Sequence, residues 1–326
     1  MNGEEQRLGV IDALSAGFSA VAQHPWLILP PAILDLILWQ GPRLSVRPLV
    51  ERLLNLWQGM MMASTPEASS SMTRLVTDLL SGSDQDLNLL LLLSNRLVGQ
   101  PSLAALLPGG GLGGVIEIRN ALLAIVGFVV LTAIGLFIAT LYLSLIVSQL
   151  REEGPDWAGF GRRLARRWLQ LALYLIALAI VIVAVSVPFS IAITIAMWLG
   201  PTIGATLISI ISIIMIWLGL WMFLSLFFVA DAIVLDDVNV ITAVWRSVNV
   251  VGRNFWATVG LWLLTELIMV GFSIIWQKLS QWPAGAVFSI IANAYLGTGL
   301  VAASLIFYRD RYQRWQSQRQ KRLSAA

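Results

Sequence analysis

The sequence predicts an all-α, polytopic integral membrane protein: a helical bundle of about six spans in three hairpins, each preceded by an interfacial amphipathic helix. Three observations predict it: an apolar composition, a series of long uncharged segments, and short two-faced segments ahead of them. The chain has 326 residues, of which 58% are hydrophobic and 12% are charged. Soluble proteins average about 45–50% apolar and about 25% charged residues, so the bilayer must solvate much of this surface.

The membrane spans are predicted from segment length, because about 20 helical residues cross a bilayer. Five apolar segments reach that length, at 121–148, 169–198, 205–230, 257–277 and 285–308. A shorter sixth segment, 26–40, contains Pro30 and Pro31, and we predict that it also spans. Asp35 lies near one end of this segment, where we expect water to reach the carboxylate.

The chain divides into four parts by composition. Residues 1–40 are predicted to hold a surface helix and the first span, and residues 121–308 a five-span membrane bundle. Between them, residues 41–120 contain Ser-rich and Gly-rich stretches, and we predict an extramembrane insert with amphipathic helices lying on or near the membrane. Residues 309–326 are predicted to form a basic cytoplasmic tail.

Lysine and arginine are distributed unevenly between the two sides of a six-span chain. One side receives fourteen of them, which are Arg7, Arg151, Arg162, Arg163, Arg166, Arg167, Arg246, Arg253, Arg309, Arg311, Arg314, Arg319, Lys321 and Arg322. The other side has Lys278 in a short loop and the arginines of the long insert, and loops beyond about 60 residues count little in orienting a chain. The positive-inside rule therefore places both termini in the cytoplasm, and we predict the plasma membrane of a prokaryote as the location.

An internal repeat underlies the two-faced segments. The stretch "NVITAVWRSVNVVGRNFW" at 239–256 resembles "GVIDALSAGFSAVAQHPW" at 9–26, and "DWAGFGRRLARRWLQ" at 156–170 shows the same pattern. Each copy places apolar residues on one face and polar residues on the other, which is typical of a helix in the headgroup plane. Asp156 and Asp237 stand where helix N-caps are expected.

Arginines on the polar faces are candidate contacts for anionic lipid headgroups or for a protein partner at the cytoplasmic face. They are Arg162, Arg163, Arg166, Arg167, Arg246 and Arg253. The alternative interpretation is that these helices only anchor and orient the spans. The basic tail also attracts anionic lipid, an effect worth about 1 kcal/mol per charge near the surface. Because the tail emerges directly from a membrane span, we expect no nucleic-acid partner.

Glu266 is an ionisable residue near the centre of a predicted span. An acid at that depth costs about 2.5–3.5 kcal/mol on insertion scales. We therefore expect Glu266 to face the bundle, to be protonated, or to pair with Asn293 or Thr298 on the next span. Glu266 and Asn293 would then serve either transport or a structural hydrogen bond. Three further acids border the membrane surface, where we expect them to cap and solvate the next helix: Asp231, Asp236 and Asp237.

One stretch resembles a known family. In "FFVADAIVLDDVNVITAVWRSVNVVGRNFW" the pattern is carried by Asp237, Ala243, Ser247, Asn254, Phe255 and Trp256. It resembles prokaryotic six-span proteins related to the membrane domain of glycerophosphodiester phosphodiesterases, many of them labelled as domains of unknown function. The close match covers residues 225–275, and the insert at 41–120 departs from the compact pattern of that family. Since the soluble phosphodiesterase domain is absent from this sequence, the resemblance implies an architecture and a membrane role rather than a reaction.

The functional residue types needed for catalysis are sparse. The chain has no cysteine, and His24 is its single histidine, so we expect no metal, no cofactor and no catalytic triad. Our first hypothesis is a non-enzymatic integral membrane protein that interacts with lipid or organises a membrane partner. The alternative is a small-solute or ion transporter that uses Glu266, and the remote alternative is an intramembrane enzyme. The oligomeric state is left open.

Overall fold

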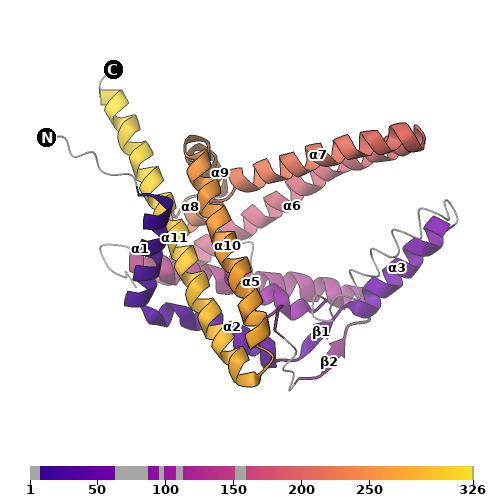
Figure 1. Cartoon of the computed structure of the whole chain (residues 1–326), viewed down its shortest axis with the longest axis horizontal. Coiled ribbons are helices and arrows are strands. Elements are labelled where there is room, and N and C mark those ends of the chain that lie inside the picture. Colours follow the sequence, from indigo (N-terminus) through magenta and orange to yellow (C-terminus); the bar gives the residue numbers. More distant parts are fainter. Residues whose placement is uncertain (1–7, 63–86, 95–98, 108–112, 151–158, 325–326) are drawn as a thin grey trace. The chain divides into compact units, whose positions relative to one another are not determined.

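The computed structural model describes residues 8–62, 87–94, 99–107, 113–150 and 159–324. These residues are almost entirely helical, which confirms the predicted all-α class (Figure 1). The long elements are α1 (Val10–Gln23), α2 (Leu29–Gln40), α3 (Arg47–Met62), α5 (Ala121–Leu150), α6 (Phe160–Trp198), α7 (Pro201–Ser225), α8 (Val229–Asp236), α9 (Val240–Arg253), α10 (Phe255–Leu279) and α11 (Pro283–Ser324). The short elements are the 3₁₀ helices η1 (Pro25–Ile28) and η2 (Leu89–Leu93) and the strands β1 (Arg43–Ser45) and β2 (Val115–Glu117).

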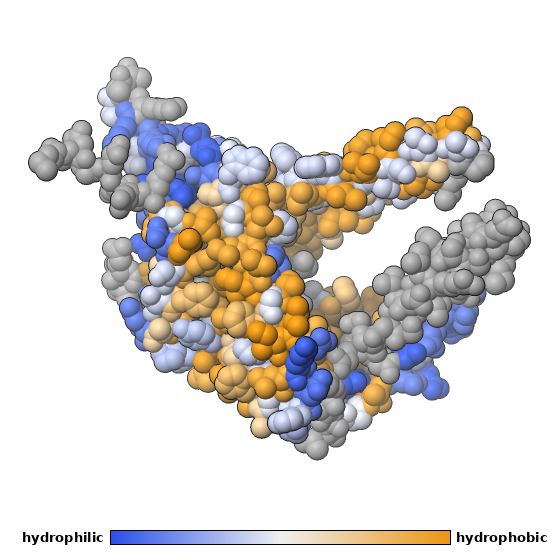
Figure 2. All heavy atoms as spheres, viewed as in Figure 1, coloured by the Kyte–Doolittle hydropathy of each residue, from blue (hydrophilic) through white to orange (hydrophobic). Residues whose placement is uncertain are grey.

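Within these described ranges, five helices are long and apolar enough to cross a membrane: α5, α6, α7 continued into α8, α10 and α11. A sixth span results if α1 and the η1–α2 segment, bent by 99°, act as one broken unit. Large apolar side chains on α6 and α7 are exposed, among them Ile180, Ile216 and Trp217 at 63%, 70% and 67%. Figure 2 shows α7 as largely orange, while the C-terminal end of α11 is blue. The protein is therefore a multi-pass membrane protein.

The few hydroxyl groups on the exposed part of α6 are satisfied within the helix itself. Ser186, Ser190 and Thr194 each donate a hydrogen bond to the carbonyl oxygen four residues earlier, at 2.7, 2.9 and 2.8 Å. In lipid a polar group needs an internal partner because no water is available. These residues are thus compatible with a helix surrounded by hydrocarbon.

Two predicted boundaries differ from the structure. Helix α6 runs without a break from Phe160 through Pro188 to Trp198, so the prediction of a separate surface helix over 156–170 is wrong for the described residues from 159 onward. No helix-breaking residue separates the arginine-rich start from the apolar part, and the helix simply continues. In the same way α11 continues past residue 308 as one helix into the predicted tail. The other two repeat helices, α1 and α9, are separate short helices as predicted.

The chain forms two compact units. Unit 1 comprises Met1–Ala20, Leu143–Leu267 and Gly299–Ala326, and unit 2 comprises Val21–Tyr142 and Ile268–Thr298. In unit 1, α1 and α11 approach so closely that a Cβ atom on Gly17 would collide with the backbone of Gly299 and Ala303. Phe228 is fully buried and stacks on Phe307 of α11, with ring centroids 5.8 Å apart. Unit 1 therefore has its own tightly packed core.

In unit 2, a non-helical part of the insert packs against membrane helices. Pro101 occupies the space that a side chain at Gly297 of α11 would need, and the backbone of Leu92 and Leu93 does the same at Gly135 of α5. The two ends of the insert meet as β1 and β2 pair in parallel, with Leu44 opposite Ile116. These parts of the predicted extramembrane insert are thus integral to the packing of unit 2.

The segment that contains Pro101, Ser102 and Leu103 also covers Asp35 of α2. Its side chain is 1% exposed, and it accepts hydrogen bonds from Ser102 Oγ at 2.5 Å and from the backbone N–H of Leu103 at 2.7 Å. The expectation that water solvates Asp35 is therefore wrong. The reason is that a segment distant in the sequence folds back over this face of α2.

Candidate functional site

The polar groups of unit 1 gather at one end of its helices, which we name the charged end. It comprises the last turn of α5, the first turns of α6, the helices α8 and α9, and α11 from residue 304 onward. Three acids from the stretch "ADAIVLDD" lie here, and together they bond to α6, α9 and α11. The expectation that they merely cap and solvate α9 is wrong, because each has a specific partner.

A serine holds the break between α7 and α8. Residues 226–228 form a turn after α7, which leaves backbone groups without helical partners. Ser247 of α9 is fully buried; its hydroxyl donates to the carbonyl oxygen of Ser225 at 2.7 Å and accepts from the N–H of Phe228 at 3.1 Å. One hydroxyl therefore satisfies both sides of the break and fixes where α8 begins.

Asp231 and Asp236 tie α8 to α11 and α9. Asp231 is 8% exposed and accepts a hydrogen bond from Ser304 Oγ at 2.6 Å. One oxygen of Asp236, Oδ2, accepts from Arg246 Nη1 at 2.5 Å and from the Tyr308 hydroxyl at 2.9 Å. The guanidinium of Arg246 also lies over the ring of Tyr312, 4.4 Å from its centroid, which adds a cation–π contact.

Asp237 ties α8 to α6. It ends α8 in the left-handed conformation with φ 55°, a region that Asp tolerates better than most residues. Its carboxylate accepts two hydrogen bonds from Arg167, from Nε at 2.5 Å and from Nη2 at 3.0 Å. The predicted N-cap role of Asp237 is wrong: Asn239 caps α9, accepting from the N–H of Thr242 at 3.0 Å. The other predicted N-cap, Asp156, lies outside the described residues.

The six arginines predicted to contact lipid fall into two groups. Arg162, Arg166 and Arg253 are exposed and Arg163 is half-buried, so these four lie at the surface. Arg167 is only 4% exposed and is engaged by Asp237, and this prediction of a headgroup contact is wrong. It lies three residues after Leu164 and four before Leu171, both buried, so it belongs to the buried face of α6.

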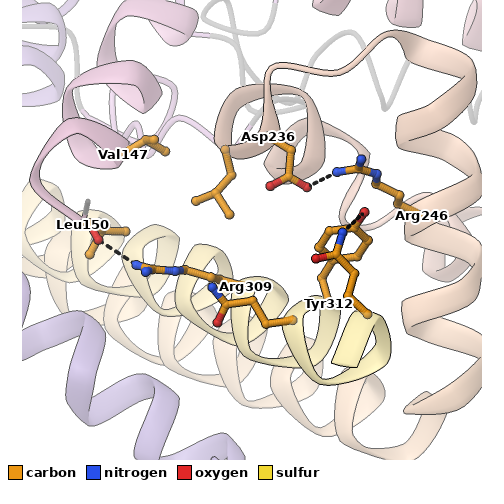
Figure 3. A pocket seen from close by; sticks show the side chains of 9 residues that line it. Val147, Leu150, Asp236, Arg246, Arg309 and Tyr312 are labelled. Carbon is orange, nitrogen blue, oxygen red and sulfur yellow. Dashed lines mark hydrogen bonds and ion pairs between the residues drawn. The ribbon is translucent and has the colours of Figure 1, made fainter. Parts of the chain in front are cut away.

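The sixth arginine, Arg246, is half-buried and lines a pocket at the charged end. The pocket has a volume of about 380 Å³ (Figure 3). Its lining residues are Val147, Leu150, Leu235, Asp236, Arg246, Arg309, Tyr312, Gln313 and Gln316. Arg309 donates from Nη1 to the carbonyl oxygen of Leu150 at 2.8 Å, which satisfies an unpaired acceptor at the end of α5. We name this the Arg246 pocket.

The lining of the Arg246 pocket combines charged, polar and apolar side chains. Two guanidinium groups supply hydrogen-bond donors and positive charge, and Asp236 supplies one carboxylate. Among the described residues, no group of three metal-binding side chains is present here or elsewhere. The chemistry of the lining suits a ligand that carries both an anionic and a hydrogen-bond-donating group.

The predicted intramembrane pair is not a clear site. Glu266 is exposed on α10, so the expectation that it faces the bundle is wrong. Asn293 is 3% exposed, and its side-chain amide nitrogen has no hydrogen-bond partner among the described residues. The Thr298 hydroxyl donates to the carbonyl oxygen of Ala294 at 2.6 Å and accepts from Tyr142 at 3.0 Å. Since Glu266 belongs to unit 1 and Asn293 to unit 2, their pairing stays a prediction.

Several residues of the charged end could not be identified as functional from the sequence. Tyr312 and Arg309 were taken as part of a basic tail, although residues 309, 312, 313 and 316 follow the helical spacing that places them on one face. That spacing is the signal that could have found the pocket wall. The partners of the acids lie up to 73 residues away in sequence and leave no local signal.

Comparisons of this chain with protein-family models, with curated proteins and with solved structures find no match. The resemblance to the phosphodiesterase membrane domain is therefore neither supported nor contradicted by them. The residues that carry it have structural contacts in this chain: Asp237 binds Arg167, Ser247 holds the α7–α8 break, and Ala243 is fully buried. In this chain those positions fix the local fold of the charged end.

Substituting Ser247 by Ala is expected to lower the free energy of unfolding by about 1–3 kcal/mol, because it leaves two buried backbone groups unsatisfied. The matched control is Ser209→Ala, whose exposed hydroxyl bonds only within α7 and whose loss is expected to cost below about 0.5 kcal/mol. Unfolding in mixed detergent micelles, followed by circular dichroism, gives both values. Equal stability of the two variants would show that Ser247 does not hold the break.

Proposed function

We propose that this protein is a non-enzymatic, multi-pass membrane protein that binds anionic lipid headgroups with the charged end of unit 1. The supporting observation is that exposed cations gather beside the ends of apolar helices. These cations are Arg162, Arg166, Arg253, Arg319 and Lys321. Each charge near an anionic leaflet contributes about 1 kcal/mol of attraction, and the neighbouring polar groups are engaged in holding helices together rather than in a reactive arrangement.

We further propose that the charged end faces the cytoplasm of a prokaryote and contacts the inner leaflet of its plasma membrane. The excess of arginine on this side supports that orientation through the positive-inside rule. The resemblance of residues 225–275 to six-span prokaryotic proteins agrees with the same placement. A protein partner at this face would use the same surface.

The orientation is tested by thiol labelling, which the absence of native cysteine makes simple. Single cysteines at Gly161, Val248 and Gln318, all exposed, are expected to resist a membrane-impermeant maleimide in intact cells and to react after permeabilisation. Labelling of all three from outside would reverse the orientation. Labelling of Gly161 and Val248 from opposite sides would contradict the arrangement of the spans.

Lipid binding is tested with the double variant Arg162→Gln/Arg166→Gln. It is expected to bind anionic phosphatidylglycerol about fivefold more weakly per charge removed, because about 1 kcal/mol is lost with each. Mass spectrometry of intact protein–lipid complexes, released from uncharged detergent at several salt concentrations, measures the affinity. The matched control is Arg52→Gln/Arg119→Gln, which removes two exposed arginines of unit 2. An equal loss in both variants, or no loss in either, would refute a specific role for the charged end.

A further inference from the structure

The Arg246 pocket has an unused acceptor as well as donors. Asp236 employs Oδ2 for its bonds to Arg246 and Tyr308, whereas its other oxygen, Oδ1, has no hydrogen bond to the described residues. Figure 3 shows Asp236 and Arg309 approaching the pocket from different elements, α8 and α11. A carboxylate oxygen accepts but never donates, so a ligand group next to it must carry an N–H or O–H.

Two arginine side chains line the pocket and are each held by a contact within unit 1. Arg309 donates from Nη1 to the carbonyl oxygen of Leu150, and its side chain lines the pocket. Arg246 is fixed from two directions, by the ion pair to Asp236 and by stacking on Tyr312. Guanidinium groups bind phosphate through parallel, charge-assisted hydrogen bonds, and two of them line this pocket.

An apolar wall completes the pocket. Val147 and Leu150 come from the last turn of α5, and Leu235 comes from the end of α8. These residues lie at the ends of two helices that are long and apolar enough to cross a membrane, α5 and α7 continued into α8. A volume of about 380 Å³ is within the range of small-molecule sites and is ample for one headgroup.

We propose that the Arg246 pocket binds one phospholipid whose phosphodiester headgroup carries a hydrogen-bond donor, an ammonium or a hydroxyl. The phosphate lies against Arg246 and Arg309, the donor group lies against Oδ1 of Asp236, and the start of the acyl region lies against the apolar wall. The proposal rests on the proposed function in so far as the charged end must lie among lipid headgroups. It goes further by naming a single site and the headgroup chemistry that the site distinguishes.

Ethanolamine and choline headgroups separate this proposal from simple charge attraction. Both are zwitterionic phosphodiesters, but only the ethanolamine nitrogen carries N–H donors. Purified wild-type protein in uncharged detergent is titrated with phosphatidylethanolamine and phosphatidylcholine of identical acyl chains, and bound lipid is counted by mass spectrometry of the intact complex. We expect about tenfold tighter binding of the ethanolamine lipid, since a hydrogen bond to a charged group discriminates by that order. Equal affinities would overturn the proposal without any variant.

Variants locate the discrimination. Asp236→Asn is expected to abolish the preference for ethanolamine over choline. Arg309→Gln is expected to lower the affinity for both lipids by the same factor. The matched control is Tyr308→Phe, which removes a donor from the same carboxylate but does not line the pocket, and it should keep the preference. A preference that survives Asp236→Asn in a folded protein would overturn the assignment of the donor site.

Two further arms separate the possible sources of failure. Soluble phosphoethanolamine carries the same phosphate and ammonium groups without acyl chains. We expect that it does not compete with the lipid at equal concentration. Effective competition would overturn the lipid assignment in favour of a free phosphate ester. Arg162→Gln/Arg166→Gln should retain the ethanolamine preference. Loss of phosphatidylglycerol binding in that double variant with equal ethanolamine and choline affinities would uphold the proposed function and reject the pocket.

Discussion

The fold of unit 1 depends on three carboxylates at the ends of its helices, of which Asp231 is buried and Asp236 and Asp237 are half-buried. Removing such a charge from water costs several kcal/mol, and only close donors offset that cost. Each acid has such donors: Asp231 bonds to α11, Asp236 bonds to α9 and α11, and Asp237 bonds to α6. Because each acid requires its own partner, the short helix α8 can occupy only one position among its neighbours. Apolar packing alone would not set the positions of these helix ends, and the hydrogen bonds fix them.

The same interactions shape the surface on which the function is proposed. Asp236 draws Arg246 inward and leaves one oxygen toward the Arg246 pocket, while Arg309 closes the end of α5 and lines the same space. Folding and binding therefore share residues at this end. Arg162 and Arg166 are exposed and form no ion pair with the described residues, so substituting them should change attraction to lipid without unfolding the protein. The bonded cations therefore hold helices together, and the exposed cations are the ones proposed to attract lipid.

The membrane class and the spans could be predicted from the sequence because they depend on length and composition, which are local properties. Helix ends at α1 and α9 were also predictable, since Pro25 and Asn254 follow them. The continuity of α6 was missed because a change from polar to apolar residues does not break a helix. The partners of Asp237 and Asp35 were beyond reach, as they lie 70 and 67 residues away. The burial of Arg167 is hard to predict because three adjacent arginines give this turn of α6 a polar appearance, although Leu164 and Leu171, about one turn away on either side, are buried.

The central claim, that ion pairs to its carboxylates hold the charged end together, is tested most directly by a double-mutant cycle on Arg167, which is buried, and Asp237, which is half-buried. Unfolding free energies of wild type, Arg167→Ala, Asp237→Ala and the double variant are measured in the same mixed micelles. The account predicts a loss of about 3–5 kcal/mol for removing Asp237 alone, because Arg167 is left as a buried unpaired charge. The loss of unfolding free energy in the double variant should be smaller than the sum of the two single losses by at least about 1.5 kcal/mol. Losses that add to within about 0.5 kcal/mol would contradict the claim.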